Sequence, residues 1–244
     1  MHSEPTTLIG KRVLISGGTT GIGRAIAVAL VAQRCEVLVF GRHERELEDA
    51  LRDMRAVGTG GDGMVADQAE LEQVRRVMQR VAEKWGGLDI LVNNAAVGGD
   101  SLTNDDESTW DYVARANLVG YLTCARHAIE RMPAAGHVIN IGSISAEHLN
   151  PGGEIYTATK AGVRAFSETL RKGVEQRGIK VSLIEPGRTG SDIHEQPVAE
   201  LEKEQAEEKM LIAEDVAACV LFCLRQPSRA NISFMQVLPR KARE

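Results

Sequence analysis

Short apolar runs alternate along the chain with longer segments in which apolar positions recur at a helical period. The apolar runs predict β-strands near 12–16, 36–40, 63–66, 89–93, 136–141, 180–185 and 232–237. The segments between them predict helices near 21–32, 44–55, 70–84, 106–131, 155–176 and 213–225. Several strands, such as Val37 to Phe40, are apolar throughout, which is typical of strands buried on both faces of a parallel sheet.

This alternation predicts an α/β fold, because parallel strands need crossover connections, which are usually helices. Right-handed crossovers give a doubly wound, Rossmann-type sheet. For it we expect seven parallel strands in the order 3-2-1-4-5-6-7 with helices on both faces. The 244 residues contain no repeat or linker, so we expect a single domain over residues 1–244.

The segment from Glu195 to Lys209 has an unusual composition, because glutamates dominate it and apolar residues are few. It predicts a lid-like helical segment at about 190–212. Two interpretations remain open: a solvated helix with a charged outer face, or a lid over a substrate site.

The bulk composition excludes several classes of protein. The formal net charge is −5 and the pI about 5.8, with no basic stripe for nucleic acid. No apolar run reaches the roughly 18 residues of a membrane span, so we expect no binding to a membrane. Residues 1–7 lack the apolar core of a signal peptide, so we expect a cytoplasmic protein. The four cysteines fit neither a disulfide framework nor a zinc site, and we expect no metal.

Candidate chemistry lies directly after the predicted strands. Gly17, Gly41, Asn94, Ser143 and Gly187 all follow strands, and the carboxyl ends of parallel strands form the ligand-binding edge of such a sheet. This convergence predicts one site at that edge.

A glycine-rich turn follows the first strand and opens the first helix. Gly17, Gly21 and Gly23 have the spacing G-x-x-x-G-x-G, which lets the backbone approach a pyrophosphate at the helix N-terminus. A glycine-rich turn without a ligand remains the alternative.

Tyr156 and Lys160 are one helical turn apart, so their side chains share a helix face. A nearby ammonium lowers the pKa of a phenol toward the range useful for acid–base exchange. The hydroxyl of Ser143 could hold a carbonyl oxygen beside that phenol. These residues suit the reduction of a ketone or the oxidation of an alcohol if a hydride carrier lies alongside.

These motifs occur in one order and together resemble the short-chain dehydrogenase/reductase family. The resemblance covers about residues 8–239 and rests on Gly17-x-x-x-Gly21-x-Gly23, Asn93-Asn94-Ala95-Ala96, Asn117, Ser143, Tyr156-x-x-x-Lys160 and Pro186-Gly187. The chain departs from the family pattern at Ala96, where glycine is usual, at Ser191, where threonine is common, and in lacking a glycine-rich C-terminal stretch.

The resemblance implies a role for each matching residue. Catalysis would rest on Asn117, Ser143, Tyr156 and Lys160, with Tyr156 as the proton donor and Asn117 bending its helix and holding a water. The cofactor would contact Gly17, Thr19, Thr20, Gly21, Ile22, Gly23, Arg42, Asp67, Gln68, Asn94, Ala95, Tyr156, Lys160, Pro186, Gly187, Thr189 and Ser191. Asp67 could equally cap a helix.

The family also pairs the helices near 106–131 and 155–176 between subunits. Small residues there, Ala125, Ala128, Ala161, Gly162 and Ala165, therefore predict a homodimer or homotetramer.

Residues after the second strand predict NADP(H) rather than NAD(H). NAD sites usually carry an acidic residue there, whereas an arginine suits the 2′-phosphate of NADP. This chain has Gly41 followed by Arg42. An arginine that stacks on adenine in either cofactor is the alternative.

The substrate is the least defined part of the site. Its lining is expected from Ser143, Ser145, His148, Asn150, Tyr156 and Arg188. Arg188 could face solvent, pair with an acid of the 195–209 segment, or bind a substrate carboxylate, and a loose resemblance suggests a small 3-hydroxy or 3-oxo acid.

We therefore expect an oxidoreductase that interconverts a carbonyl and a secondary alcohol. Two alternatives remain: a catalytically silent NADP-sensing regulator, or a lyase or epimerase on the same scaffold.

Overall fold

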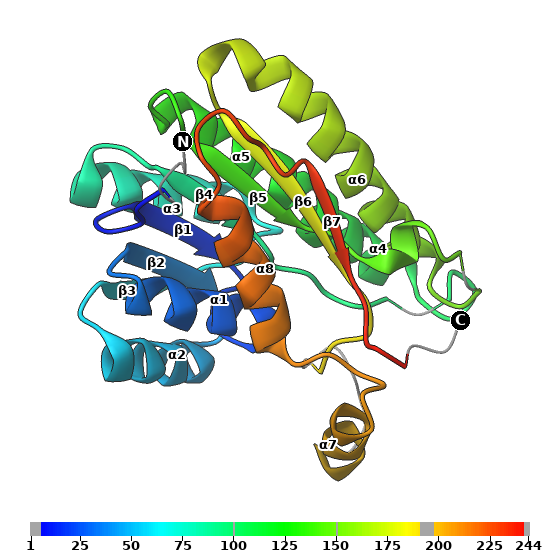
Figure 1. The fold of residues 1–244 in the computed structure, drawn as a ribbon. Coiled ribbons are helices and arrows are strands. Elements are labelled where there is room, and N and C mark those ends of the chain that lie inside the picture. The colour runs from blue at the N-terminus through cyan, green and yellow to red at the C-terminus, as the bar shows by residue number, and fades with distance from the viewer. Residues whose placement is uncertain (1–5, 100, 150, 191–197, 242–244) are drawn as a thin grey trace.

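The computed structural model describes residues 6–99, 101–149, 151–190 and 198–241. Seven parallel strands form one sheet in the order β3-β2-β1-β4-β5-β6-β7, which confirms the predicted order (Figure 1). Their bounds are β1 Arg12–Ser16, β2 Glu36–Gly41, β3 Gly61–Val65, β4 Ile90–Asn93, β5 His137–Ile141, β6 Lys180–Pro186 and β7 Phe234–Val237.

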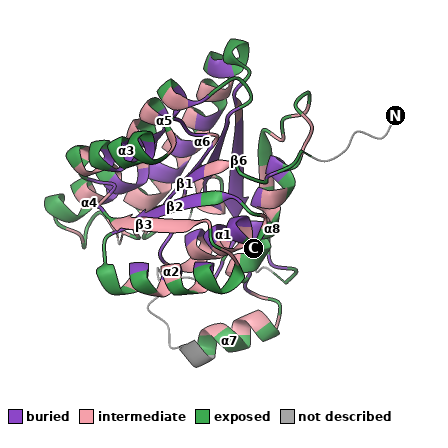
Figure 2. Ribbon diagram, turned by 90° about the vertical axis from the view of Figure 1, so that its left-hand side faces the viewer, coloured by how far each residue is buried: buried purple, intermediate pink, exposed green. Residues whose placement is uncertain are grey.

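Helices cover both faces of the sheet, as alternate side chains of the strands require. On one face, α1 (Gly21–Ala32), α2 (Glu44–Val57) and α8 (Ala213–Leu224) pack on Val13, Ile15 and their neighbours. On the other, α3 (Leu71–Trp85), α5 (Gly120–Arg131) and α6 (Glu154–Val174) pack on a core that includes Leu14 and Leu38. Figure 2 shows that the central strands lie buried between these layers, whereas the edge strand β3 is only partly buried.

The helix predicted near 106–131 is interrupted. It consists of α4 (Glu107–Ala114), a π-helical turn over Arg115–Val119, and α5. Asp106 caps α4 by accepting a hydrogen bond from the backbone N–H of Thr109 at 2.8 Å. The π turn shifts the helical register by one residue, and Asn117 lies within it, fully buried.

Two of the small residues expected on an intersubunit surface are in the core instead. Ala125 and Ala128 are buried against the sheet, because their face of α5 points inward. Ala161 and Gly162 of α6 are partly buried, and Ala165 is exposed.

The short helix α7 (Val198–Ala206) lies in the segment expected to be lid-like. It stands away from the body of the molecule and lies at the end of the sheet where the strands terminate (Figure 1). The chain after it is tied to the C-terminal segment, since Glu208 pairs with Arg240 at 3.1 Å and Lys241 at 3.3 Å.

Candidate active site

The turn between β1 and α1 is packed tightly against the end of β4. Gly17 has a φ of +60°, and a Cβ atom there would lie 2.6 Å from the Cα of Ala95. Asn94 donates from its side-chain nitrogen to the carbonyl of Gly17 at 2.8 Å. The hydroxyl of Ser16 accepts from the backbone N–H groups of Asn94 and Ala95 at 3.1 and 3.2 Å. Asn94 and Ala95 therefore fix the shape of this turn.

Helix α1 begins directly at the turn. Gly21 has a φ of +48°, and a side chain on Gly23 would meet the carbonyl of Gly17. The first amides of a helix lack intrahelical partners, and the side chain of Thr20, which precedes α1, does not cap them. Such amides favour an anionic ligand. Ile22, in the first turn of α1, is partly buried.

Beside this turn, the end of β2 has no room for a side chain at Gly41. A Cβ atom there would lie 2.8 Å from the methyl group of Thr19 and closer still to its hydroxyl. Thr19 is itself buried. An acidic residue at position 41 would therefore collide with Thr19.

Arg42 and Asp67 are joined through Tyr112 of α4. A guanidinium N–H of Arg42 donates to the phenol oxygen at 2.8 Å, and the phenol donates to Oδ2 of Asp67 at 2.8 Å. The other carboxylate oxygen of Asp67 accepts from the backbone N–H of Ala69 at 2.8 Å. Asp67 thus shapes the turn that precedes α3, but it does not cap this helix, because Glu70 is the residue at the N-cap.

Gln68 points into the protein. It is buried, and its side-chain nitrogen donates to the carbonyl of Ala116 at 2.7 Å. That carbonyl belongs to the π turn, so Gln68 supports the irregular stretch of helix.

The predicted catalytic residues lie together at the carboxyl end of β5 and the N-terminal end of α6. Lys160 is buried, donates from Nζ to the carbonyl of Ile141 at 3.1 Å, and lies 5.7 Å from the ring centre of Tyr156. The hydroxyl of Ser143 lies 3.1 Å from that of Ser145 and accepts from the Ser145 backbone N–H at 3.1 Å. Ser143 also forms a hydrogen bond with Tyr156 that lowers the pKa of the phenol.

The expected lowering of the pKa of Tyr156 is wrong for this structure, because that pKa is raised. Burial raises the pKa of Tyr156, and only the hydrogen bond with Ser143 opposes that rise. Burial also lowers the pKa of Lys160 to about 8, while Glu185 acts to raise it. Removal from water is thus the largest cause of both pKa shifts, because it disfavours the charged form of each group.

Asn117 binds the loop that follows β4. Its side chain accepts from the backbone N–H of Val97 and donates to the carbonyl of Val97, both at 2.8 Å. It also lies 3.4 Å from the hydroxyl of Thr159 on α6. Asn117 therefore links the π turn, this loop and the helix that carries Tyr156.

Glu185 is a candidate residue that the sequence analysis did not single out. It lies on β6 facing α6 and is completely buried. A Cβ atom on Gly142 would lie 2.8 Å from its Cγ, so its carboxylate is next to the segment that joins Ile141 to Ser143. An acid near the carboxyl end of a predicted buried strand was the signal available in the sequence, since a buried charge needs a partner.

The chain after β6 is packed against the C-terminal segment. A Cβ atom on Gly187 would lie 2.9 Å from Cδ of Pro239, so this contact accounts for the glycine after Pro186 without a cofactor. Thr189 is buried and donates from its hydroxyl to the carbonyl of Gly187 at 2.9 Å.

Of the three possibilities for Arg188, the structure shows an ion pair with the glutamate-rich segment. Arg188 lies 2.8 Å from Glu204 of α7. Among the other predicted substrate residues, Ser145 is partly buried and His148 is exposed. Asn150, and Ser191 of the predicted cofactor set, lie outside the described residues.

This arrangement matches one family of known proteins. The family model described as short chain dehydrogenase matches residues 11–202. The chain belongs to the short-chain dehydrogenase family. The resemblance inferred from the motifs is thereby confirmed.

Relatives in this family are similar along nearly the whole chain. An uncharacterised oxidoreductase of Staphylococcus aureus (strain N315) is 30% identical over 237 residues, which is 96% of this chain and 99% of the relative. A short-chain dehydrogenase from Burkholderia cenocepacia J2315, solved in complex with NADP, has a TM-score of 0.86 and 28% identity and covers 96% of this chain and 98% of its own. A variant of actinorhodin polyketide ketoreductase, solved with NADPH, has a TM-score of 0.84 and 25% identity and covers 94% and 96%.

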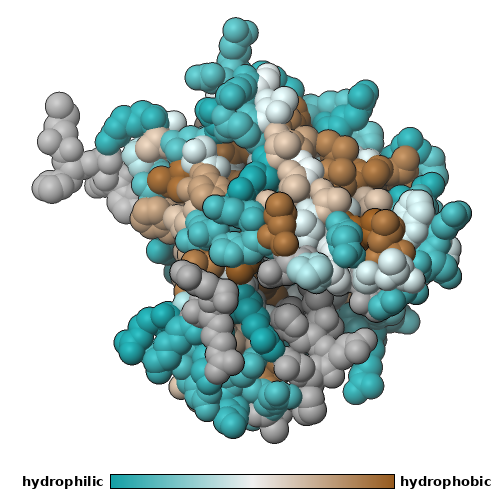
Figure 3. All heavy atoms as spheres, turned by 90° about the vertical axis from the view of Figure 1, so that its right-hand side faces the viewer, coloured by the Kyte–Doolittle hydropathy of each residue, from teal (hydrophilic) through white to brown (hydrophobic). Residues whose placement is uncertain are grey.

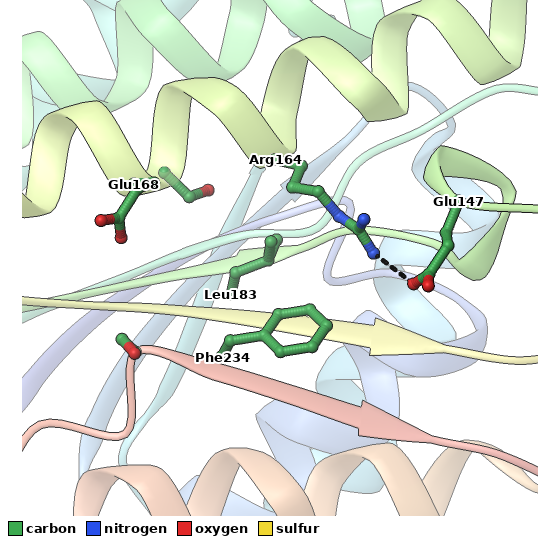
Figure 4. Close-up of a pocket in the computed structure, with 7 residues that line it drawn as sticks. Glu147, Arg164, Glu168, Leu183 and Phe234 are labelled. Carbon is green, nitrogen blue, oxygen red and sulfur yellow. Dashed lines mark hydrogen bonds and ion pairs between the residues drawn. The ribbon is translucent and has the colours of Figure 1, made fainter.

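A hollow of about 290 Å³ lies between α6 and β7, apart from this short-chain dehydrogenase site (Figure 4). It is lined by Glu147, Arg164, Ser167, Glu168, Leu183, Ser233 and Phe234. Its charged groups are already paired, since Arg164 bonds Glu147 at 3.0 Å and Glu168 lies 2.9 Å from Arg171. None of the residues predicted to bind cofactor or substrate lines it.

Two further features concern the part of the chain that the structure describes. No described helix is long and apolar enough to serve as a membrane-spanning segment. No three His, Cys, Asp or Glu residues among those described form a group that could hold a metal ion.

Proposed function

We propose that this short-chain dehydrogenase is an NADP(H)-dependent oxidoreductase that interconverts a carbonyl and a secondary alcohol. The observation that carries the proposal is the group of Ser143, Tyr156 and buried Lys160 at the same edge of the sheet as the glycine turn. The cofactor would supply or accept the hydride, while these residues would transfer the proton to or from the substrate oxygen.

In the direction of reduction, Tyr156 donates its proton to the carbonyl oxygen. Burial raises its pKa, which keeps the phenol protonated and suits it to act as an acid. Ser143, next to the phenol, holds the same oxygen by donating a hydrogen bond. Lys160, with a pKa lowered to about 8, remains mostly protonated at neutral pH and stabilises the phenolate once it forms.

The residues at the glycine turn fit the phosphates of a dinucleotide. The uncapped start of α1 supplies amide donors for a pyrophosphate, and Gly17 allows close approach of the backbone. Asn94 holds the turn in shape. We assign the pyrophosphate to this turn and the nicotinamide end to the strand ends near Tyr156.

The preference for NADP(H) rests on the end of β2. Thr19 excludes an acidic side chain at Gly41, and Arg42 is the cation that follows. An arginine offers several donors in a planar fork that fits phosphate oxygens. The solved relatives with NADP and NADPH agree with this assignment.

For the substrate we propose a small polar carbonyl compound, with a 3-oxo acid as the first class to test. Arg188 would bind its carboxylate only if the contact with Glu204 opened. A panel of ketones and alcohols, followed by the absorbance of NADPH, tests the function. No turnover with any member would contradict it.

We also propose that the protein forms a homodimer or homotetramer. Figure 3 shows apolar patches among hydrophilic residues on the face seen at the right of Figure 1. Exposed apolar residues of the chain include Val119 and Leu122 at the π turn and α5, and Phe234 on the edge strand β7. Such residues suit contact with a second copy.

A reducing compartment such as the cytoplasm is the proposed location. The four cysteines are free thiols, and burial raises the pKa of Cys124 to about 12. Cell fractionation tests this, and recovery of the protein from an oxidising compartment would contradict it.

A further inference from the structure

Tyr112 connects two residues assigned to opposite parts of the adenosine site. Arg42 follows β2 and would meet a 2′-phosphate, whereas Asp67 follows β3 and would meet the adenine. The phenol accepts from Arg42 at 2.8 Å and donates to Asp67 at 2.8 Å. The guanidinium also lies 5.7 Å from the centre of the phenol ring.

We infer that Tyr112 is a specificity-determining residue of the cofactor site, which holds Arg42 ready for the 2′-phosphate of NADP(H). This inference rests on the proposed function and assigns part of its cofactor preference to a residue outside the glycine turn. Tyr112 acts through Arg42 and is therefore a positioning residue.

The chemistry of the phenol suits this role. Burial and the hydrogen bond to Asp67 both raise the pKa of Tyr112, so the phenol is neutral near pH 7. A neutral phenol can donate to a carboxylate and accept from a guanidinium at the same time, as it does here. Phenylalanine would keep the ring contact and lose both hydrogen bonds.

The position of Arg42 explains why such help matters. Its side chain is exposed, and a free arginine loses considerable rotamer entropy when it binds a ligand. The bond to Tyr112 uses one of five donors, so the others remain for phosphate oxygens. Restricting the side chain before binding therefore favours NADPH and leaves NADH unaffected.

The test is the affinity of NADPH, NADH and adenosine 2′,5′-bisphosphate for the wild type and for Tyr112→Phe, Arg42→Ala and the double variant. Tyr112→Phe should weaken NADPH and the bisphosphate about three- to tenfold, the value of one hydrogen bond, and leave NADH within about twofold. In the Arg42→Ala background the same change should have no further effect. Asp111→Asn is the matched control, because Asp111 is adjacent on α4 but pairs with Arg115 at 2.7 Å.

The outcomes separate this inference from the function it rests on. Equal loss of NADPH and NADH in Tyr112→Phe, or losses that add fully with Arg42→Ala, would overturn the inference. If NADPH is preferred through Arg42 and Tyr112→Phe changes nothing, the inference fails and the proposed function stands. If the wild type binds both cofactors equally and Arg42→Ala does not alter their ratio, the NADP preference fails and the inference with it. Thermal unfolding checks that each variant is folded.

Discussion

Arg164 of α6 holds the buried carboxylate of Glu185 through two hydrogen bonds, from Nε to Oε1 at 2.8 Å and from a terminal nitrogen to Oε2 at 2.5 Å. Glu185 has no exposed side-chain surface, whereas Arg164 is 33% exposed. The same carboxylate favours the charged form of Lys160, one turn before Arg164 on the helix. The ion pair with Arg164 therefore holds the carboxylate of Glu185 in a fixed position, from which its negative charge acts on Lys160.

Glu185→Gln should move the alkaline limb of the pH profile of kcat to lower pH. The carboxylate opposes the burial that lowers the pKa of Lys160 to about 8, so its removal lowers that pKa further. Activity that needs a charged Lys160 is then lost at lower pH. Glu147→Gln, which removes the exposed partner of Arg164, is the control and should leave the limb in place. Identical profiles for all three proteins would disprove the link.

Lys160→Met should abolish most activity and yet raise the melting temperature at pH 7. The folded-state pKa of Lys160, about 8, lies below its ordinary value of 10.5, so the folded state binds fewer protons between these pH values. Stability from this group therefore rises with pH from about 8 to 10.5, so at pH 7 the buried charge destabilises the folded state. A gain of several degrees is expected. A lower melting temperature would mean that the bond to Ile141 outweighs burial.

Tyr156→Phe should reduce turnover at least about a hundredfold, the usual scale for general acid–base catalysis. The ring is kept and only the proton donor is lost, so NADPH should bind with nearly unchanged affinity. Steady-state kinetics and a cofactor titration measure the two effects. Thr157→Ala, on the same turn of α6, serves as a control. Near-normal turnover of Tyr156→Phe would end the proposed mechanism.

Arg188→Ala and Glu204→Gln should have the same modest effect, about a two- to fivefold rise in KM, on acidic and neutral ketones alike. The two residues lie 2.8 Å apart and are 42% and 23% exposed, and such pairs contribute little. Glu202→Gln, on the exposed side of α7, should have no effect. A ten- to hundredfold loss confined to acidic ketones in Arg188→Ala would show instead that Arg188 binds a carboxylate.

Light scattering at micromolar concentration should show a dimer or a tetramer. Ala165→Glu places a charge on the exposed face of α6 and should shift the protein toward the monomer. Ala56→Glu, at an exposed position of α2, is the matched control. A monomeric wild type contradicts the proposed assembly.

The order of the elements could be predicted because several buried strands are apolar throughout. Val37 to Phe40 and Ile90 to Val92 have no polar face, and each is followed by an amphipathic helix. The limits of β3 were less accurate, 63–66 rather than Gly61–Val65, because Gly61, Asp62 and Gly63 are not typical strand residues.

What the sequence could not show depends on contacts between distant segments. The family resemblance implied a bend at Asn117, but no pattern in the sequence showed that it takes the form of a π turn over Arg115–Val119. The raised pKa of Tyr156 depends on the elements that bury it. Tyr112 meets Arg42 and Asp67 only after α4 has packed against the ends of β2 and β3, so no local motif marks it.

The contact between Gly41 and Thr19 also restricts which residues could replace the glycine at the end of β2. An acid introduced at position 41 alone would meet the buried threonine and disturb the glycine turn before it could bind a ribose. A smaller residue at position 19 would relieve this contact, although by itself it offers no new cofactor contact. The effects of substitutions at positions 19 and 41 are therefore expected to depend on each other, so the outcome at one position is set by the residue at the other.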